Sequence, residues 1–198
     1  MSSLLVRLIL ENTDKKLIKV LDYGSGFEPK IIQIVQKQLI SKGFKIKIDC
    51  YDLYNKKQLI ELNNNSSISF HNIDKLDSNK IIYDFCIIAD TLHHIGVDNE
   101  DYIKSIFVKI KSLSKFIIIK DHFEWNLFSR LCVKMMDFIG NYYNDVNIPN
   151  KYYTKIQFEN FLQGLNLKIQ DKITNERYHP KIFMFLSNPR FHFIYLIS

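Results

Sequence analysis

Cysteine and arginine are both scarce in this chain. Only three of the 198 residues are cysteines, Cys50, Cys86 and Cys132, and no two of them have the spacing of a redox or metal-binding motif. Only four of the 27 basic residues are arginine, and the lysines are scattered singly among acidic residues although the net charge is +6. Because nucleic-acid surfaces use clustered basic residues and arginine forks, we expect no nucleic-acid partner.

Long apolar runs and linker-like segments are also missing. The longest apolar runs, such as Phe116 to Ile119, are far shorter than the roughly 20 residues that a membrane span needs. The first residues include a short apolar stretch that no small-residue cleavage site follows. The six glycines and four prolines form no linker, and no repeat is visible. We therefore expect one cytoplasmic domain over residues 1–198, a monomer or homodimer without integral membrane contact.

What the chain does contain is an alternation of two periodicities. Short β-branched runs bounded by polar residues alternate with segments of helical spacing, a pattern typical of a parallel sheet covered by helices. The expected helices include 30–41, 101–113 and 154–162, with Thr154 as the N-cap of the last. The expected strands are 18–21, 44–51, 68–70, 84–89 and 116–119.

The end of the chain follows a different pattern. Three strand-like runs, 167–173, 181–187 and 191–197, have no helical segment between them. Strands joined directly in this way pair antiparallel, so a sheet that begins parallel is predicted to close with an antiparallel hairpin.

Two glycines follow the first expected strand. In the segment KVLDYGSGFEPKI, Asp22 precedes Gly24 and Gly26 in the turn before a helix. Glycines there let the backbone approach a ligand, and the helix N-terminus favours an anionic group. A dinucleotide would need a third glycine where Pro29 stands, which disfavours NAD.

This turn resembles the first motif of the class I S-adenosylmethionine-dependent methyltransferases, an acid followed by three alternating glycines, with Glu28 in the place of the last glycine. The resemblance extends over about residues 17–197. It implies a Rossmann-like, doubly wound α/β sheet of seven strands, mostly parallel with an antiparallel C-terminal strand, and S-adenosylmethionine as the cofactor. The turn residues that it assigns to the cofactor are Asp22, Tyr23, Gly24, Ser25 and Gly26.

The same resemblance supplies further cofactor candidates. The family keeps an acid at the end of the second strand for the two ribose hydroxyls, and Asp52 fits this place better than Asp49, which the alternation puts within the strand. Asn72 and Asp74 are alternatives for the adenine amino group. Residues after the fourth strand are expected along the methionine part of the cofactor, namely Ala89, Asp90 and Leu92.

The catalytic candidates lie after the fourth and fifth strands. The segments Lys120-Asp121-His122 and 136–141 resemble a subgroup of small bacterial methyltransferases. Ligands of open α/β sheets bind at the carboxyl ends of the strands, and histidine is the usual base for acceptors that need one. The candidates are His93, His94, Asp121 and His122.

Structural roles compete with these assignments. Asp121 is also placed to cap a helix that begins near Trp125, and Asp137 to pair with Lys134 or Arg130 on a polar stripe of that helix. A metal site formed by the three histidines of this region is not expected, because their spacing matches no zinc signature and cysteine ligands are missing nearby.

A helical insertion is expected over about residues 123–153. In the superfamily an insertion at this place often covers the acceptor pocket, and its methionine and aromatic residues, such as Met135, Tyr142 and Tyr143, suit an apolar lid. The fourth strand is not followed by the Asn/Asp-Pro-Pro-aromatic motif of amino-methylating enzymes. The expected function is methyl transfer to a small apolar or aromatic molecule. The alternatives are a non-catalytic binding domain of this fold and, less favoured, an NAD-dependent oxidoreductase.

Overall fold

The computed structural model describes residues 1–27, 29–65, 68–76, 83–95, 99–141, 148–174 and 191–198. Its packing divides the chain into two compact units, one made of Met1–Ala89 with Lys109–Ile118 and the other of Asp90–Val108 with Ile119–Ser198. Seven strands form one sheet in the order β3-β2-β1-β4-β5-β7-β6. The strands are β1 (Leu17–Tyr23), β2 (Lys45–Asp52), β3 (Ser69–Asn72), β4 (Tyr83–Ala89), β5 (Ser114–His122), β6 (Ile169–Thr174) and β7 (His192–Ile197).

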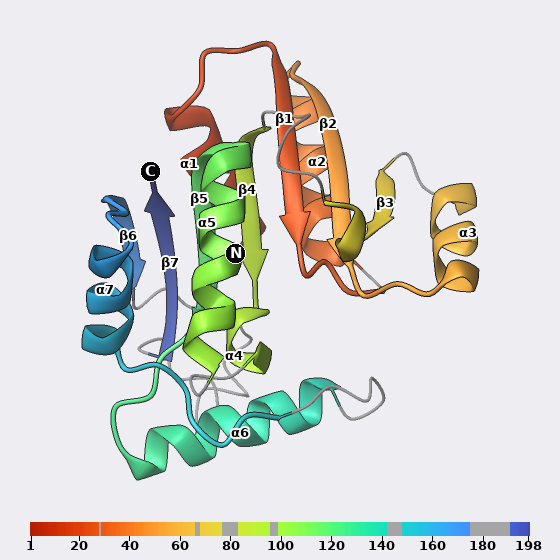
Figure 1. Ribbon diagram of the computed structural model, residues 1–198. Coiled ribbons are helices and arrows are strands. Elements are labelled where there is room, and N and C mark those ends of the chain that lie inside the picture. Colours follow the sequence, from red (N-terminus) through yellow and green to blue (C-terminus); the bar gives the residue numbers. More distant parts are fainter. Residues whose placement is uncertain (28, 66–67, 77–82, 96–98, 142–147, 175–190) are drawn as a thin grey trace. The chain divides into compact units, whose positions relative to one another are not determined.

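The first unit contains the parallel half of this sheet. Strand β1 pairs parallel with β2 and with β4, and β2 pairs parallel with β3. Its helices are α1 (Ser2–Glu11), α2 (Lys30–Ser41) and α3 (Lys56–Asn65), and a 3-10 turn, η1 (Ile73–Lys75), follows β3. Figure 1 shows α2 beside β2 and α3 next to β3, and α1 packs against α2. Every β4 residue up to Ile88 is buried, as the continuous apolar run of a central parallel strand predicts.

The helices of this unit differ in how strongly the sequence predicts them. Helix α2 has the bounds that its periodicity predicts, with Ile32, Val35 and Leu39 on the buried face. Helix α1 buries Leu5 and Ile9 although the sequence pattern predicts no helix there. Helix α3 ends in a run of three asparagines, 63–65, and no apolar periodicity marks it in the sequence.

The second unit holds the C-terminal half of the fold. It contains α4 (Leu92–Ile95), α6 (Leu127–Asn141), α7 (Lys155–Gly164), β6 and β7, while α5 (Glu100–Leu113) and β5 contribute residues to both units. Its core is aromatic: the rings of Phe123 and Phe193 stack with centroids 3.9 Å apart, and Phe158 lies 5.2 Å from Phe193. Helix α7 begins at the predicted N-cap, where Thr154 and Gln157 form a capping box.

The predicted fold class is confirmed. Strand β7 runs antiparallel to β6, so the chain ends in an antiparallel pair after a parallel start. The strand-like run 181–187 lies outside the described residues. Among the helices that the structure describes, none combines the length and the apolar character needed to cross a membrane.

Candidate functional site

The turn between β1 and α2 has the backbone geometry that glycine favours. Gly24 and Gly26 have φ angles of 75° and 68°. A Cβ atom added at Gly26 would meet no other atom within 4 Å, so the conformation and not the space around it favours glycine there. The Gly24 N–H donates to the carbonyl of Tyr51 at 2.8 Å. Glu28, which stands at the third glycine position of the motif, lies outside the described residues.

Side chains from the end of β2 hold this turn in place. Asp52 accepts hydrogen bonds from the Gly26 N–H at 2.7 Å and from the Leu53 N–H at 2.6 Å. The Tyr54 hydroxyl donates to the Gly26 carbonyl at 2.6 Å and lies 2.6 Å from the Ser25 hydroxyl. Of the two acids considered for the ribose, the structure therefore places Asp52 at the glycine turn.

Asp49 has a different environment. Its carboxylate is buried within β2, accepts from the Tyr83 hydroxyl at 3.1 Å, and lies 3.6 Å from His71 Nε2. Burial opposes ionisation, but His71 and Lys47 outweigh it and lower the pKa of Asp49. These contacts make Asp49 part of the structural core of the sheet.

Asp22 lies buried beneath the glycine turn, at the end of β1. Burial raises the pKa of this carboxyl to about 7, the thiol of Cys50 opposes the rise, and the charge of Asp52 adds to it. Its neighbour Tyr23 is also buried and is the last residue of β1. Asp22 is therefore poised between its charged and neutral forms near neutral pH.

The two adenine candidates also differ in their contacts. The Asn72 amide donates to the carbonyl of Tyr54 at 2.8 Å and accepts from the N–H of Asp74 at 2.9 Å, so it caps the η1 turn. Asp74 is exposed. The carboxylate of Asp74 is thus the more accessible of the two side chains.

The residues expected along the methionine part of the cofactor lie between β4 and α4. Ala89 ends β4 and is half-buried, and Leu92 begins α4 and is buried. Asp90 has a φ of 52°, a conformation that aspartate tolerates better than most residues. Its carboxylate forms an ion pair with Lys120 of β5.

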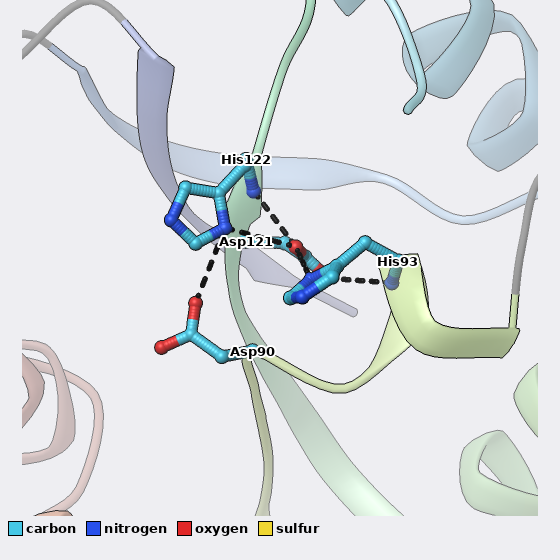
Figure 2. A group of neighbouring side chains, drawn as sticks. All are labelled: Asp90, His93, Asp121 and His122. Carbon is cyan, nitrogen blue, oxygen red and sulfur yellow. Dashed lines mark hydrogen bonds and ion pairs between the residues drawn. The ribbon is translucent and has the colours of Figure 1, made fainter. Parts of the chain in front are cut away.

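Three of the four catalytic candidates gather inside the second unit (Figure 2). The His93 Nδ1 atom lies 2.5 Å from Asp121 Oδ1, and the His93 N–H donates to Asp121 Oδ2 at 3.2 Å. His122 Nδ1 lies 3.5 Å from Asp121 Oδ1 and 3.4 Å from Asp90 Oδ1. Asp121 therefore joins the two histidines, and its carboxylate accepts an N–H of α4. The expected cap of the helix near Trp125 is wrong, since Asn126 accepts from the Ser129 N–H there.

The sequence reasoning missed two further members of this group. His93 Nε2 lies 3.4 Å from Asp137 Oδ2, and the Tyr152 hydroxyl donates to the same oxygen. The expected pairing of Asp137 with Lys134 or Arg130 is wrong, since Asp137 is buried and Arg130 pairs instead with Glu124 at 2.6 Å. The available signal was an acid placed directly between the apolar residues Met136 and Phe138.

The carboxylates around His93 set its protonation state. Burial lowers the pKa of this imidazole, but Asp121 and Asp137 outweigh the burial and raise the pKa to about 10. In the other direction, burial raises the pKa of Asp121, but the charge of His93 and the hydrogen bond from His122 keep it well below the ordinary value. His93 is thus an imidazolium at neutral pH, with its two N–H groups directed at carboxylates.

His94, the fourth candidate, is less enclosed. Its side chain is half-buried on α4, and its ring centroid lies 3.9 Å from that of His93. Of the four candidates it is the one that a molecule from outside the core can reach.

Helix α6 forms most of the described part of the expected insertion. Its outward face carries large apolar side chains at helical spacing, whereas Cys132 and Val133 are buried. A hollow of about 290 Å³ opens on this face, lined by Lys134, Met135, Phe138, Ile139 and Ile148. The exposed apolar residues of the helix are Leu127, Phe128, Leu131, Met135, Phe138 and Ile139. Tyr142 and Tyr143 lie outside the described residues.

No protein-family model and no curated protein matches the sequence. Solved structures do match the fold. The plantazolicin methyltransferase BpumL, solved with SAH, aligns over 100% of this chain and 82% of its own with a TM-score of 0.63 and 14% identity. The mitomycin 7-O-methyltransferase MmcR aligns over 100% of this chain and 53% of its own, with a TM-score of 0.63 and 13% identity.

A cyclopropane-fatty-acyl-phospholipid synthase-like protein from Lactobacillus casei aligns over 100% of this chain and 89% of its own, with a TM-score of 0.60 and 10% identity. The chain spans less than two thirds of some other matches, namely 62% of the cyclopropane synthase MmaA2 from Mycobacterium tuberculosis and 46% of LepI. At these identities the similarity establishes the fold, which is the Rossmann-like methyltransferase fold that the sequence resemblance predicts.

Proposed function

We propose that the protein is an S-adenosylmethionine-dependent methyltransferase that acts on a small apolar or aromatic molecule. The observation that carries the proposal is the turn after β1. Gly24 and Gly26 have positive φ angles there, and Asp22, just before the turn, is buried. Asp52, at the end of β2, accepts a hydrogen bond from the Gly26 N–H. Support comes from solved structures of the same fold, among them LepI, described as a complex with SAM, and BpumL, described as a complex with SAH.

The residues of the first unit fit this cofactor. Gly24 and Gly26 leave the backbone open to close approach, and Asp22 is an acid for a cationic amino group. Asp52 carries the two oxygens needed for a pair of ribose hydroxyls. Asp74 takes the adenine amino group, because its exposed carboxylate is the more accessible of the two candidate side chains.

The chain's own residues must orient the acceptor and take up its proton. When bound, the cofactor supplies a methyl group on a positively charged sulfur, which an acceptor atom attacks in line. We assign the base to His94, because its half-buried side chain is accessible while His93 is held as an imidazolium. Asp121 is a positioning residue that fixes α4 at the end of β5, and His122 supports it by donating its backbone N–H to the Asp121 carboxylate.

The apolar face of α6 is the proposed acceptor surface. Four of the five residues that line its hollow are apolar, and the hollow has a volume of about 290 Å³. This volume lies near the lower end of the range of about 300–1,000 Å³ for small-molecule sites. A flat aromatic or short aliphatic acceptor is the class that fits this hollow.

Calorimetric titration with S-adenosylmethionine, S-adenosylhomocysteine and NAD tests the cofactor assignment. We expect S-adenosylmethionine and S-adenosylhomocysteine to bind with micromolar affinity. This binding should be lost in Gly24→Arg and Asp52→Ala. It should be unchanged in Asp101→Ala, which removes a fully exposed acid. Binding of NAD alone would overturn the proposal. Unchanged affinity in both site variants would place the cofactor elsewhere.

Replacement of His94 tests the proposed base. Once incubation with labelled cofactor has identified an acceptor, His94→Ala should lower turnover by about 100-fold or more, because a positioned base contributes at least this much. The affinity for S-adenosylhomocysteine should stay within twofold. His71→Ala, which alters a histidine of β3, is the control. Full turnover in His94→Ala would remove His94 from the chemistry.

A further inference from the structure

Four metal-ligating side chains converge in the second unit. Asp90, His93, Asp121 and His122 each offer one donor atom, and these atoms all lie within 4.8 Å of one another. Figure 2 shows that Asp90 and His93 flank the connection from β4 to α4, while Asp121 and His122 are adjacent at the end of β5. We call these four residues the quartet.

The spacing in the quartet suits a metal ion better than a set of hydrogen bonds. His122 Nδ1 lies 3.4 Å from Asp90 Oδ1 and 3.5 Å from Asp121 Oδ1, which is long for a hydrogen bond. Two ligands at about 2.1 Å from a tetrahedral ion are about 3.4 Å apart. The hydrogen-bonded pair of His93 Nδ1 and Asp121 Oδ1, at 2.5 Å, would have to open by about 1 Å for that geometry.

Burial supplies a second, independent observation. The exposed fractions of His93, Asp121 and His122 are 4%, 3% and 6%. His122 Nδ1 has no hydrogen-bond partner within the described part of the chain, although it points at two carboxylates. A buried polar atom without a partner is costly, and a bound cation would satisfy it.

The net charge around the quartet is negative, which favours the binding of a cation. The carboxylates of Asp90, Asp121 and Asp137 lie around the two histidines, and among the described residues one ammonium group, that of Lys120, pairs with Asp90. With both imidazoles neutral the group carries a surplus of two negative charges. A divalent ion bound by the quartet would balance this surplus.

We propose that the quartet binds one divalent transition-metal ion, with Zn²⁺ as the best fit, as a structural site that ties the β4–α4 connection to the end of β5. Two imidazole and two carboxylate donors suit Zn²⁺ better than Mg²⁺, which prefers oxygen ligands. Leu92, Tyr153, Phe158 and Phe193 help to enclose a void of only about 10 Å³ beside the quartet. A substrate cannot enter so small a space, so we infer a structural and not a catalytic role for the bound ion.

The first test is metal binding by the full chain. After treatment with a chelator and dialysis, Zn²⁺ is titrated in competition with a chromophoric chelator at pH 7.5. We expect one Zn²⁺ per chain with a submicromolar Kd, weakened at least 100-fold in Asp121→Asn and His122→Ala. Asp101→Ala is the control, since Asp101 is a fully exposed acid outside the quartet, and it should bind as the wild type does.

Asp90→Asn serves as a second variant if a more buried substitution prevents folding, because its side chain is 34% exposed. It should weaken Zn²⁺ binding at least tenfold with an unchanged circular dichroism spectrum. Co²⁺ added to the wild type should give the intense visible absorption of four-coordinate cobalt. A Kd above 100 µM, equal binding by the quartet variants, or the weak spectrum of six-coordinate Co²⁺ would each overturn the proposal. S-adenosylhomocysteine affinity, measured on the same samples, reports separately on the cofactor site.

Discussion

Asp22 combines burial with a pKa of about 7, so its charge changes within the range of ordinary buffers. If its carboxylate pairs with the cofactor's amino group, binding requires the ionised form. Affinity for S-adenosylmethionine should then rise on the order of tenfold from pH 5.5 to pH 7, a range in which the α-amino group of the ligand stays protonated. Calorimetric titration at several pH values across this range measures this change in affinity. Asp22→Asn should bind weakly at every pH, and a flat wild-type profile would contradict the pairing.

Ionisation of the Asp22 carboxyl, which favours cofactor binding, lowers the stability of the folded protein. Its pKa is higher in the folded protein than in the unfolded chain, so the native state loses stability as the pH rises from about 4 to 7. Without cofactor, Asp22→Asn should therefore raise the free energy of unfolding by about 2–4 kcal/mol at pH 8 and change it little at pH 4. Urea unfolding at both pH values measures the difference. Equal effects at the two values would show that the pKa of Asp22 is not raised in the folded protein.

Single residues were predictable where a local pattern marks them. Asp22, Gly24 and Gly26 are recognisable because the glycines follow a strand directly. The environments of Asp137 and Tyr152 could not be predicted, because their contacts join segments that only the folded chain brings together. For the same reason the sequence spacing indicates no metal site, because the quartet combines residues 90 and 93 with residues 121 and 122.

At the scale of elements, the capping box of α7 offers a measurable contribution. The Thr154 hydroxyl accepts from the Gln157 N–H at 3.3 Å, and the Gln157 side chain accepts from the Thr154 N–H at 3.0 Å. Thr154→Ala should lower the free energy of unfolding by about 1 kcal/mol, because it leaves an N–H of the first turn without its partner. Urea unfolding tests this, with Thr154→Ser as a control that should lose much less. No loss in the alanine variant would contradict the role of the cap.

Elements with strong local signals were predicted well. The bounds of α2 follow from its apolar periodicity, and α7 from its N-cap. Helix α3 has few apolar residues and a polar end, so no periodicity marks it. The outward apolar face of α6 was not apparent either, because an amphipathic pattern does not say which face the fold covers.

For the whole molecule, ligand binding should appear as thermal stabilisation. A ligand at 100 times its Kd adds about 2.7 kcal/mol to the stability of the folded state. For a chain of 198 residues this raises Tm by about 5–10 °C. Scanning calorimetry with S-adenosylhomocysteine should show this shift in the wild type and in Asp101→Ala, and not in Gly24→Arg. A comparable shift in Gly24→Arg would place the ligand away from the glycine turn.

The fold as a whole was more predictable than its site. Alternating strands and helices followed by strand-like runs indicate a parallel sheet with an antiparallel end, and the strand order bears this out. The surplus of lysine, in contrast, predicts neither the fold nor the site. Several lysines are used in specific contacts, such as Lys15 and Lys120 with the carboxylates of Asp84 and Asp90.

The discontinuity of the first unit has a consequence for synthesis. This unit needs Lys109–Ile118 in addition to Met1–Ala89, so it cannot be completed when its first 89 residues leave the ribosome. The nascent chain must wait for at least 29 further residues, while the buried faces of β1 and β4 still lack part of their cover. At about 5–20 residues per second this delay lasts a few seconds, a period in which chaperone binding would protect the exposed strands.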